Sequence, residues 1–108
     1  MTVEQLASSL GFTPRALPDK DREVAGAYVG DLLSWVMGRA ASNSAWVTIM
    51  SNVNVIAVAT LADVSCVIFA EGVTPDKELT ELAYAKGVNL LTSNSPAYET
   101  AILLSELV

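Results

Sequence analysis

The chain has 108 residues, of which 52% are apolar and only 17% are charged, and its net charge is −6 at pH 7. Its six basic residues are scattered, so the basic patch that nucleic acid or an anionic membrane surface would need is missing, and we expect neither partner. The absence of histidine excludes histidine-based catalysis and histidine metal sites, and the single cysteine, Cys66, excludes an internal disulfide.

Residues 1–22 form a lead-in. Thr2 and Gln5 make a T-x-x-Q capping box, which predicts a short helix ending at Gly11. The two prolines of FTPRALP (12–18) predict an extended segment, because proline is excluded from a helix interior. The N-terminus has no basic region followed by a long apolar core, and no apolar run approaches the length of a membrane span. We therefore expect a cytoplasmic protein.

Strand-like and helix-like segments alternate from residue 24 onward. Residues 24–30 (VAGAYVG) predict a strand, and Asp31 is placed to cap a helix over 32–40 whose apolar residues form one stripe. Residues 45–50 (AWVTIM) are rich in β-branched and aromatic side chains and predict a second strand.

The next segment, SNVNVIAVATLA (51–62), begins with two asparagines, and the part that follows them is apolar on every side. Asparagine is a good N-cap, so Asn52 or Asn54 predicts the start of a buried helix over 53–62. The alternative is that these amides line a small polar pocket at the edge of a sheet. The sequence favours the cap and leaves the pocket open.

Two more strands and two more helices complete the chain. Residues 64–72 predict a strand buried on both faces, in which Cys66 is a small core residue. The next helix is predicted to start with Thr74 as N-cap and Pro75 at its first position, and to end at Gly87. A strand over 88–93 is followed by a last helix, with Ser95 as its cap and Pro96 at its first position.

This alternation predicts one α/β domain over residues 1–108, with a mostly parallel sheet of about four or five strands joined by right-handed crossovers. Strand order is not determined by the pattern. Trp35 and Trp46 are expected in the core or in an interface, and the lone carboxylates Asp63 and Glu71 on the solvated surface.

Polar residues gather where the first two strands of the alternation end. In open α/β sheets, ligands bind outside the carboxyl ends of strands at a topological switch point. The candidate ligand-binding residues are Gly30, Asp31, Ser34, Thr48, Ser51, Asn52 and Asn54. They are able to hydrogen-bond a small polar or phosphorylated molecule, but they contain no nucleophile–base pair. There is no P-loop or Rossmann motif, so we expect no cofactor and no metal.

Three stretches carry a resemblance to a known family: GAYVGDLLSWVMGRA (26–40), AWVTIMSNVNVIAVATLADVSCVIFAEG (45–72) and LLTSNSPAYE (90–99). They resemble the DRTGG-domain family, whose pattern runs G-x-Y-x-G-D-L-L-S, then W-x-T, then N-x-x-A-V-A, and then a hydrophobic strand ending near glycine. The resemblance covers roughly residues 20–105. The five letters D-R-T-G-G themselves do not occur, and DREVAG (21–26) is the nearest text.

The resemblance implies an accessory α/β module. Such domains occur alone, beside nucleotide-sensing CBS domains and in phosphotransacetylases, and they are similar to the N-terminal domain of the HPr kinase/phosphorylase. We therefore expect a non-enzymatic regulatory module that senses a small polar or nucleotide-like ligand as a homodimer. The alternative is an interaction module that docks on a partner enzyme without binding a metabolite. A small hydrolase or transferase using serine or aspartate is a third hypothesis. The ligand, the partner and the pathway are not identified by the sequence.

Overall fold

The computed structural model describes residues 1–108, and its first helix starts and ends as predicted. Helix α1 (Val3–Leu10) is capped by Thr2, whose Oγ1 accepts the Gln5 N–H at 3.2 Å while Gln5 Oε1 accepts the Thr2 N–H at 2.9 Å. Gly11 ends the helix in the left-handed conformation. The extended segment that follows contains strand β1 (Thr13–Ala16), which pairs antiparallel with the last strand of the chain.

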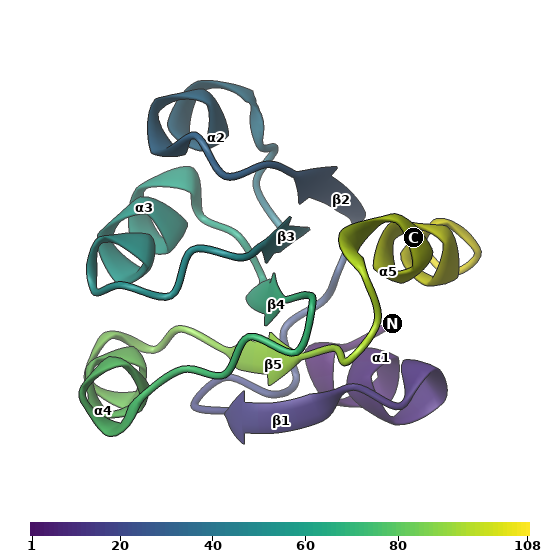
Figure 1. The fold of residues 1–108 in the computed structure, drawn as a ribbon, viewed down its shortest axis with the longest axis horizontal. Coiled ribbons are helices and arrows are strands. Elements are labelled where there is room, and N and C mark those ends of the chain that lie inside the picture. Colours follow the sequence, from purple (N-terminus) through teal and green to yellow (C-terminus); the bar gives the residue numbers. More distant parts are fainter.

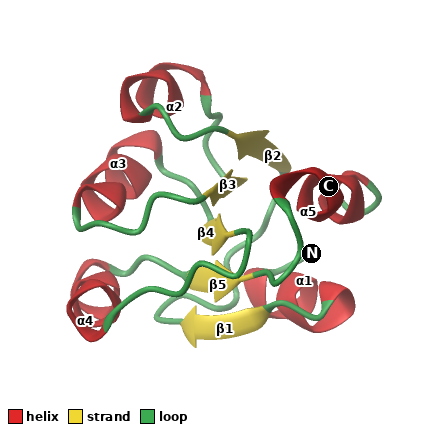
Figure 2. Cartoon of the chain, in the orientation of Figure 1, coloured by secondary structure: helices red, strands yellow, loops and turns green.

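A five-stranded sheet forms the middle of the molecule (Figure 2). Its order is β1-β5-β4-β3-β2, and the four strands that follow β1 in the chain are mutually parallel. These are β2 (Gly26–Val29), β3 (Ser44–Thr48), β4 (Cys66–Phe69) and β5 (Leu90–Thr92). The predicted α/β domain with a mostly parallel sheet is confirmed, and each strand is shorter than the apolar run that predicted it.

Helices cover both faces of the sheet (Figure 1). The three crossover helices α2 (Leu33–Arg39), α3 (Asn54–Ala62) and α4 (Lys77–Lys86) lie together on one face, and α1 and α5 (Ala97–Ser105) lie on the other. Each crossover moves the chain one strand in the same direction, so the winding does not reverse between β2 and β5. There is therefore no topological switch point between β2 and β5.

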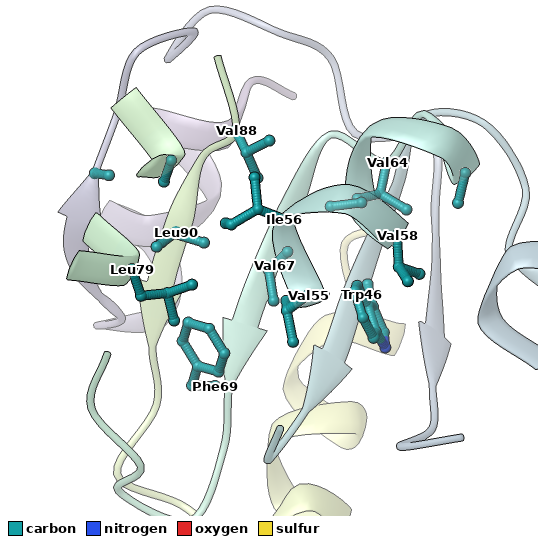
Figure 3. Packing of buried hydrophobic residues seen from close by; sticks show 14 of the residues in the cluster. Trp46, Val55, Ile56, Val58, Val64, Val67, Phe69, Leu79, Val88 and Leu90 are labelled. Carbon is teal, nitrogen blue, oxygen red and sulfur yellow. The ribbon is translucent and has the colours of Figure 1, made fainter. Parts of the chain in front are cut away.

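Two apolar clusters hold the layers together. The cluster under α2, α3 and α4 has 15 buried residues and includes Trp46, Ile56 and Phe69 (Figure 3). The cluster under α1 and α5 has 12 and includes Leu6 and Leu104. Side chains of β4 alternate between the two clusters, so this strand is buried on both faces as predicted. Burying each large apolar side chain stabilises the fold by about 1.5–3 kcal/mol.

Cys66 belongs to the second cluster and is fully buried. Because burial disfavours the thiolate, the pKa of the Cys66 thiol is raised to about 12. The prediction of a small core residue is confirmed. None of the helices combines the length and the apolar character needed to cross a membrane.

The start of α4 differs from the prediction. The N-cap is Asp76, whose Oδ1 accepts the Leu79 N–H at 2.9 Å, so the prediction of Thr74 as cap is wrong. Both residues are good caps, and the helix begins at the second of them because the Asp76 carboxylate reaches the free N–H of the first turn. Pro75 is buried just before the helix, and Gly87 ends it with φ of 73°, as predicted.

The start of α5 also differs. The helix begins at Ala97, Pro96 occupies the N-cap position without a side-chain bond, and Ser95 does not cap it. The backbone N–H of Ala97 is instead bound by a carboxylate from another loop, described below.

Candidate functional site

The end of β2 is joined to the end of β3 by one aspartate. Asp31 Oδ1 accepts hydrogen bonds from Thr48 Oγ1 at 2.8 Å and from the Ile49 N–H at 2.9 Å. The prediction that Asp31 caps α2 is therefore wrong, and Leu32 occupies the N-cap position with no side-chain bond. The carboxylate serves the neighbouring strand because parallel pairing places the ends of β2 and β3 beside each other.

Thr48 is the buried half of this link. Its side chain is almost fully buried, and its Oγ1 donates to Asp31 while accepting the Met50 N–H at 3.1 Å. One hydroxyl therefore fixes both the loop after β2 and the loop after β3.

Gly30 lies between β2 and Asp31, and both of its backbone polar groups are paired. Its N–H donates to the Val47 oxygen at 3.1 Å, and its oxygen accepts the Trp46 Nε1–H at 2.9 Å. That bond satisfies the only polar atom of the fully buried Trp46 side chain. A Cβ on Gly30 would lie 3.0 Å from Cε2 of Tyr28, so a larger residue would displace that ring.

The two asparagines have different roles. Asn52 Oδ1 accepts the Asn54 N–H at 3.0 Å, although the N-cap position itself is held by Val53, whose backbone is already helical. Asn52 therefore does not occupy the predicted N-cap position, but its Oδ1 binds the backbone N–H of the first helical residue from one position earlier. Asn54 is the first residue of α3, so a capping role for it is wrong, and its exposed side chain makes no hydrogen bond within the chain.

All seven predicted residues lie around the carboxyl ends of β2 and β3 and the starts of α2 and α3 (Figure 1). Four of these residues make hydrogen bonds within the chain, and the side chains of the other three do not. Gly30, Asp31, Thr48 and Asn52 make the bonds described above, and they hold the loops. Ser34, Ser51 and Asn54 make no side-chain hydrogen bond, so their polar groups are available to a ligand.

The sequence reasoning missed one polar group at this edge. Glu71 follows β4 with a left-handed backbone (φ of 61°), and its Oε2 accepts the Ala97 N–H at 2.7 Å. Glu71 is exposed, as predicted, but its carboxylate caps α5. The signal was its position: it follows the apolar strand directly, at the same edge as Asp31.

A second polar cluster lies at the opposite edge, before the strands begin. Asp63 accepts hydrogen bonds from Ser42 Oγ at 2.6 Å and from Arg22 Nη2 at 2.7 Å. The hydrogen bond from Ser42, followed by the hydrogen bond and charge of Arg22, lowers the pKa of Asp63. Asp63 is largely exposed as predicted, but it is also paired, and it ties the lead-in to the turn before β3.

No family model matches the sequence, and no curated protein matches it. The structure is similar to the crystal structure of the CBS and DRTGG domains of the regulatory region of Clostridium perfringens pyrophosphatase, complexed with its activator, diadenosine tetraphosphate. The TM-score is 0.72 over 95% of this chain, at 16% sequence identity. The chain has a DRTGG-like fold. It spans 45% of the length of that pyrophosphatase chain.

The DRTGG-like fold agrees with the family resemblance of the sequence. At 16% identity the likeness concerns the backbone architecture. The similar region of the pyrophosphatase is regulatory, and its activator is a nucleotide.

Proposed function

We propose that this DRTGG-like domain is a non-enzymatic regulatory module that binds a small polar or nucleotide-like ligand at the carboxyl ends of β2 and β3. The observation that carries the proposal is the bond from Thr48 and Ile49 to Asp31, which fixes two neighbouring loops. Around this rigid link, Ser34, Ser51 and Asn54 keep unpaired polar groups. Small-ligand sites fix the ligand's orientation with a few polar groups of this kind, and these three side chains would supply them.

The chemistry of these groups favours hydroxyl or base-edge contacts over phosphate contacts. Serine hydroxyls and the Asn54 amide both donate and accept, whereas the Asp31 carboxylate only accepts. A phosphate placed directly against Asp31 would meet a like charge. A ribose hydroxyl or a nucleobase edge would instead donate to the free carboxylate oxygen.

Two further observations support a regulatory role over a catalytic one. The similar pyrophosphatase structure is a regulatory region, and its CBS and DRTGG domains were crystallised together with a nucleotide activator. In this chain the single thiol, Cys66, is buried with a raised pKa, so it is not a nucleophile. Neither Ser34 nor Ser51 is hydrogen-bonded to a base that would activate its hydroxyl.

We propose that the module works as a homodimer. Large apolar side chains stay exposed over β2, α2 and the loop after β3, a distribution typical of a surface that another subunit covers. They are Val29, Leu32, Trp35, Met37 and Ile49, each between 45% and 54% exposed. Light scattering at micromolar concentration should give a mass about twice 11.4 kDa, and a mass near 11.4 kDa would contradict the dimer.

The alternative is an interaction module that docks on a partner enzyme. Trp35 favours it, because this side chain is 51% exposed and Arg39 stacks over its ring at 3.8 Å. Tryptophan and arginine are enriched among residues that dominate protein interfaces.

Thermal unfolding against a ligand panel separates the two functions. The panel contains mononucleotides, diadenosine tetraphosphate and sugar phosphates. Sensing predicts a melting temperature that rises with the concentration of one of them, as mass action requires. Ser34→Ala should reduce that shift, whereas Ser9→Ala, an exposed serine of α1 without a side-chain bond, should not. No shift across the panel, together with capture of a partner enzyme that Trp35→Ala abolishes, would favour docking.

A further inference from the structure

A surface hollow of about 400 Å³ lies between α3 and α4, on the face of the molecule formed by the crossover helices. Its lining is mostly apolar: Val53, Ile56, Ala57, Thr60, Leu61, Leu82 and Lys86. None of the seven residues at the carboxyl ends of β2 and β3 takes part in it. The volume falls in the range of small-ligand pockets, which are also mostly apolar with a few polar groups.

The lining of the hollow includes two side chains that belong to or pack against the core cluster, and one small residue, Ala57. Ile56 belongs to the buried cluster under these helices, where it lies among Val67, Val88 and Leu90 (Figure 3), and Leu82 packs against the same cluster. Ala57 leaves space between the two helices because its side chain is short. Leu61, one turn further along α3, is 74% exposed, so an apolar ligand would remove unfavourable contact with water.

Lys86 is the only basic side chain that has no partner in the chain. Lys20, Arg22 and Lys77 are in ion pairs. Arg15 donates to Thr92, and Arg39 stacks on Trp35. Lys86 lies one helical turn after Leu82 and also lines the hollow, so its long side chain brings an apolar stem and a cationic group to this surface.

We propose that this hollow binds a small amphipathic monoanion, namely a carboxylate or sulfonate with a flat or branched apolar body. The body lies between α3 and α4 over Ala57, and the anionic group pairs with Lys86. A single cation compensates one negative charge. A polyanion such as a nucleoside triphosphate is disfavoured because the chain carries a net charge of −6 and α4 also presents Glu78 and Glu81. This site shares no lining residue with the one proposed at the strand ends, although Val53 lies between Asn52 and Asn54 in the chain.

The test compares a charged and an uncharged probe of similar shape. Anilinonaphthalene sulfonate carries one sulfonate on an aromatic body, phenylnaphthylamine lacks it, and both fluoresce more strongly in apolar surroundings. We expect Lys86→Gln to lower the affinity for anilinonaphthalene sulfonate about threefold at low salt. The affinity for phenylnaphthylamine should stay unchanged. Lys77→Gln is the matched control: it makes the same charge change on the same helix outside the hollow, and should affect neither probe.

A second variant tests whether the probes bind in the hollow between α3 and α4. Ala57→Leu fills the hollow from an exposed position without removing a core contact, and should abolish binding of both probes while the melting temperature stays close to that of the wild type. Trp35→Gln, on the other exposed apolar surface, should leave both affinities unchanged. Equal sulfonate affinity in wild type and Lys86→Gln would overturn the pairing with Lys86. Probe binding that survives Ala57→Leu, or that is lost in Trp35→Gln, would overturn the site.

Discussion

The carboxylate of Asp31 and the hydroxyl of Thr48 lie 2.8 Å apart and join the ends of two neighbouring parallel strands. Asp31→Ala removes this bond and the bond from the Ile49 N–H, and leaves a buried hydroxyl without its acceptor. We expect the free energy of unfolding to fall by about 1–3 kcal/mol. Asp31→Asn should cost less, because its amide oxygen still accepts.

A double-mutant cycle with Thr48→Val measures the link itself. If the two side chains act as one unit, the losses from Asp31→Ala and Thr48→Val are not additive in urea unfolding, with a coupling energy of about 1 kcal/mol. Additive losses would contradict the link. Asp21→Ala, which removes only a 3.7 Å surface ion pair with Lys20, is the control and should change stability little.

Acid should weaken the cluster around Asp63. Its folded-state pKa lies below the ordinary value of 3.8, so the carboxylate contributes stability that is fully present above 3.8 and is lost as pH falls through the folded-state pKa. Asp63→Asn removes the titrating group and keeps a residue that tolerates the left-handed backbone (φ of 57°). Urea unfolding from neutral pH to about pH 2.5 should therefore show a shallower acid dependence in the variant. Identical acid dependence in both proteins would refute this role.

Base should act through Cys66 in the opposite direction. The folded-state pKa of the thiol is about 12, above its ordinary value of 9.0, so the unfolded chain ionises first. Stability is fully present below pH 9.0 and should fall as pH rises toward 12. A thiol reagent should leave the native protein unmodified at pH 8, and should modify it fully in denaturant. Rapid modification of the native protein would contradict the burial of Cys66.

The parts of the fold that were predictable from sequence are those whose partners lie close in the chain. The capping box of Thr2 and Gln5 spans three residues, and Gly87 needs only its own backbone to end α4. The alternating apolar segments predicted the parallel sheet for the same reason, because the apolar residues of each segment indicate by themselves that the segment is buried. The pairing of β1 with β5 joins opposite ends of the chain, so the sequence indicated only an extended segment there.

The position of the candidate site was predictable from the sequence, but the hydrogen-bond partners of its residues were not. Asp31 looked like a cap because its partners, Thr48 and Ile49, are 17 and 18 residues away. Ser95 looked like the cap of α5 because the real acceptor, Glu71, lies 26 residues before Ala97. In both cases a carboxylate at the end of one strand serves the next element in space, and propensity rules describe only the next element in sequence.

Glu71 combines a favourable bond with an unfavourable backbone. Glu71→Ala keeps the left-handed strain and loses the bond to the Ala97 N–H, so it should lower the free energy of unfolding by about 1 kcal/mol. Glu71→Gly loses the same bond but relieves strain of about 1–2 kcal/mol, so it should lie close to wild type. Chemical denaturation of the two variants checks the order. A glycine variant as unstable as the alanine variant would show that the backbone at this position is not strained.

Asn52 and Asn54 provide a matched pair two residues apart. Asn52→Ala removes the acceptor for the Asn54 N–H, and should lower the free energy of unfolding by about 1 kcal/mol. Asn52→Ser retains a capping oxygen and should stay within a few tenths of a kcal/mol of wild type. Asn54→Ser changes a side chain with no bond in the chain, so the melting temperature should barely move.

Ligand affinity should depend on Asn54 and not on Asn52, the reverse of the expected effects on stability. For any nucleotide that raises the melting temperature of the wild type, Asn54→Ser should weaken the affinity, since serine lacks the amide donor and is shorter. Asn52→Ser should leave that affinity nearly unchanged, because its oxygen is already used within the chain and the loop stays capped. Titration calorimetry on both variants measures the difference. If Asn54→Ser binds as tightly as the wild type, this asparagine does not contact the ligand, and the site at the ends of β2 and β3 loses the one side-chain amide that makes no bond within the chain.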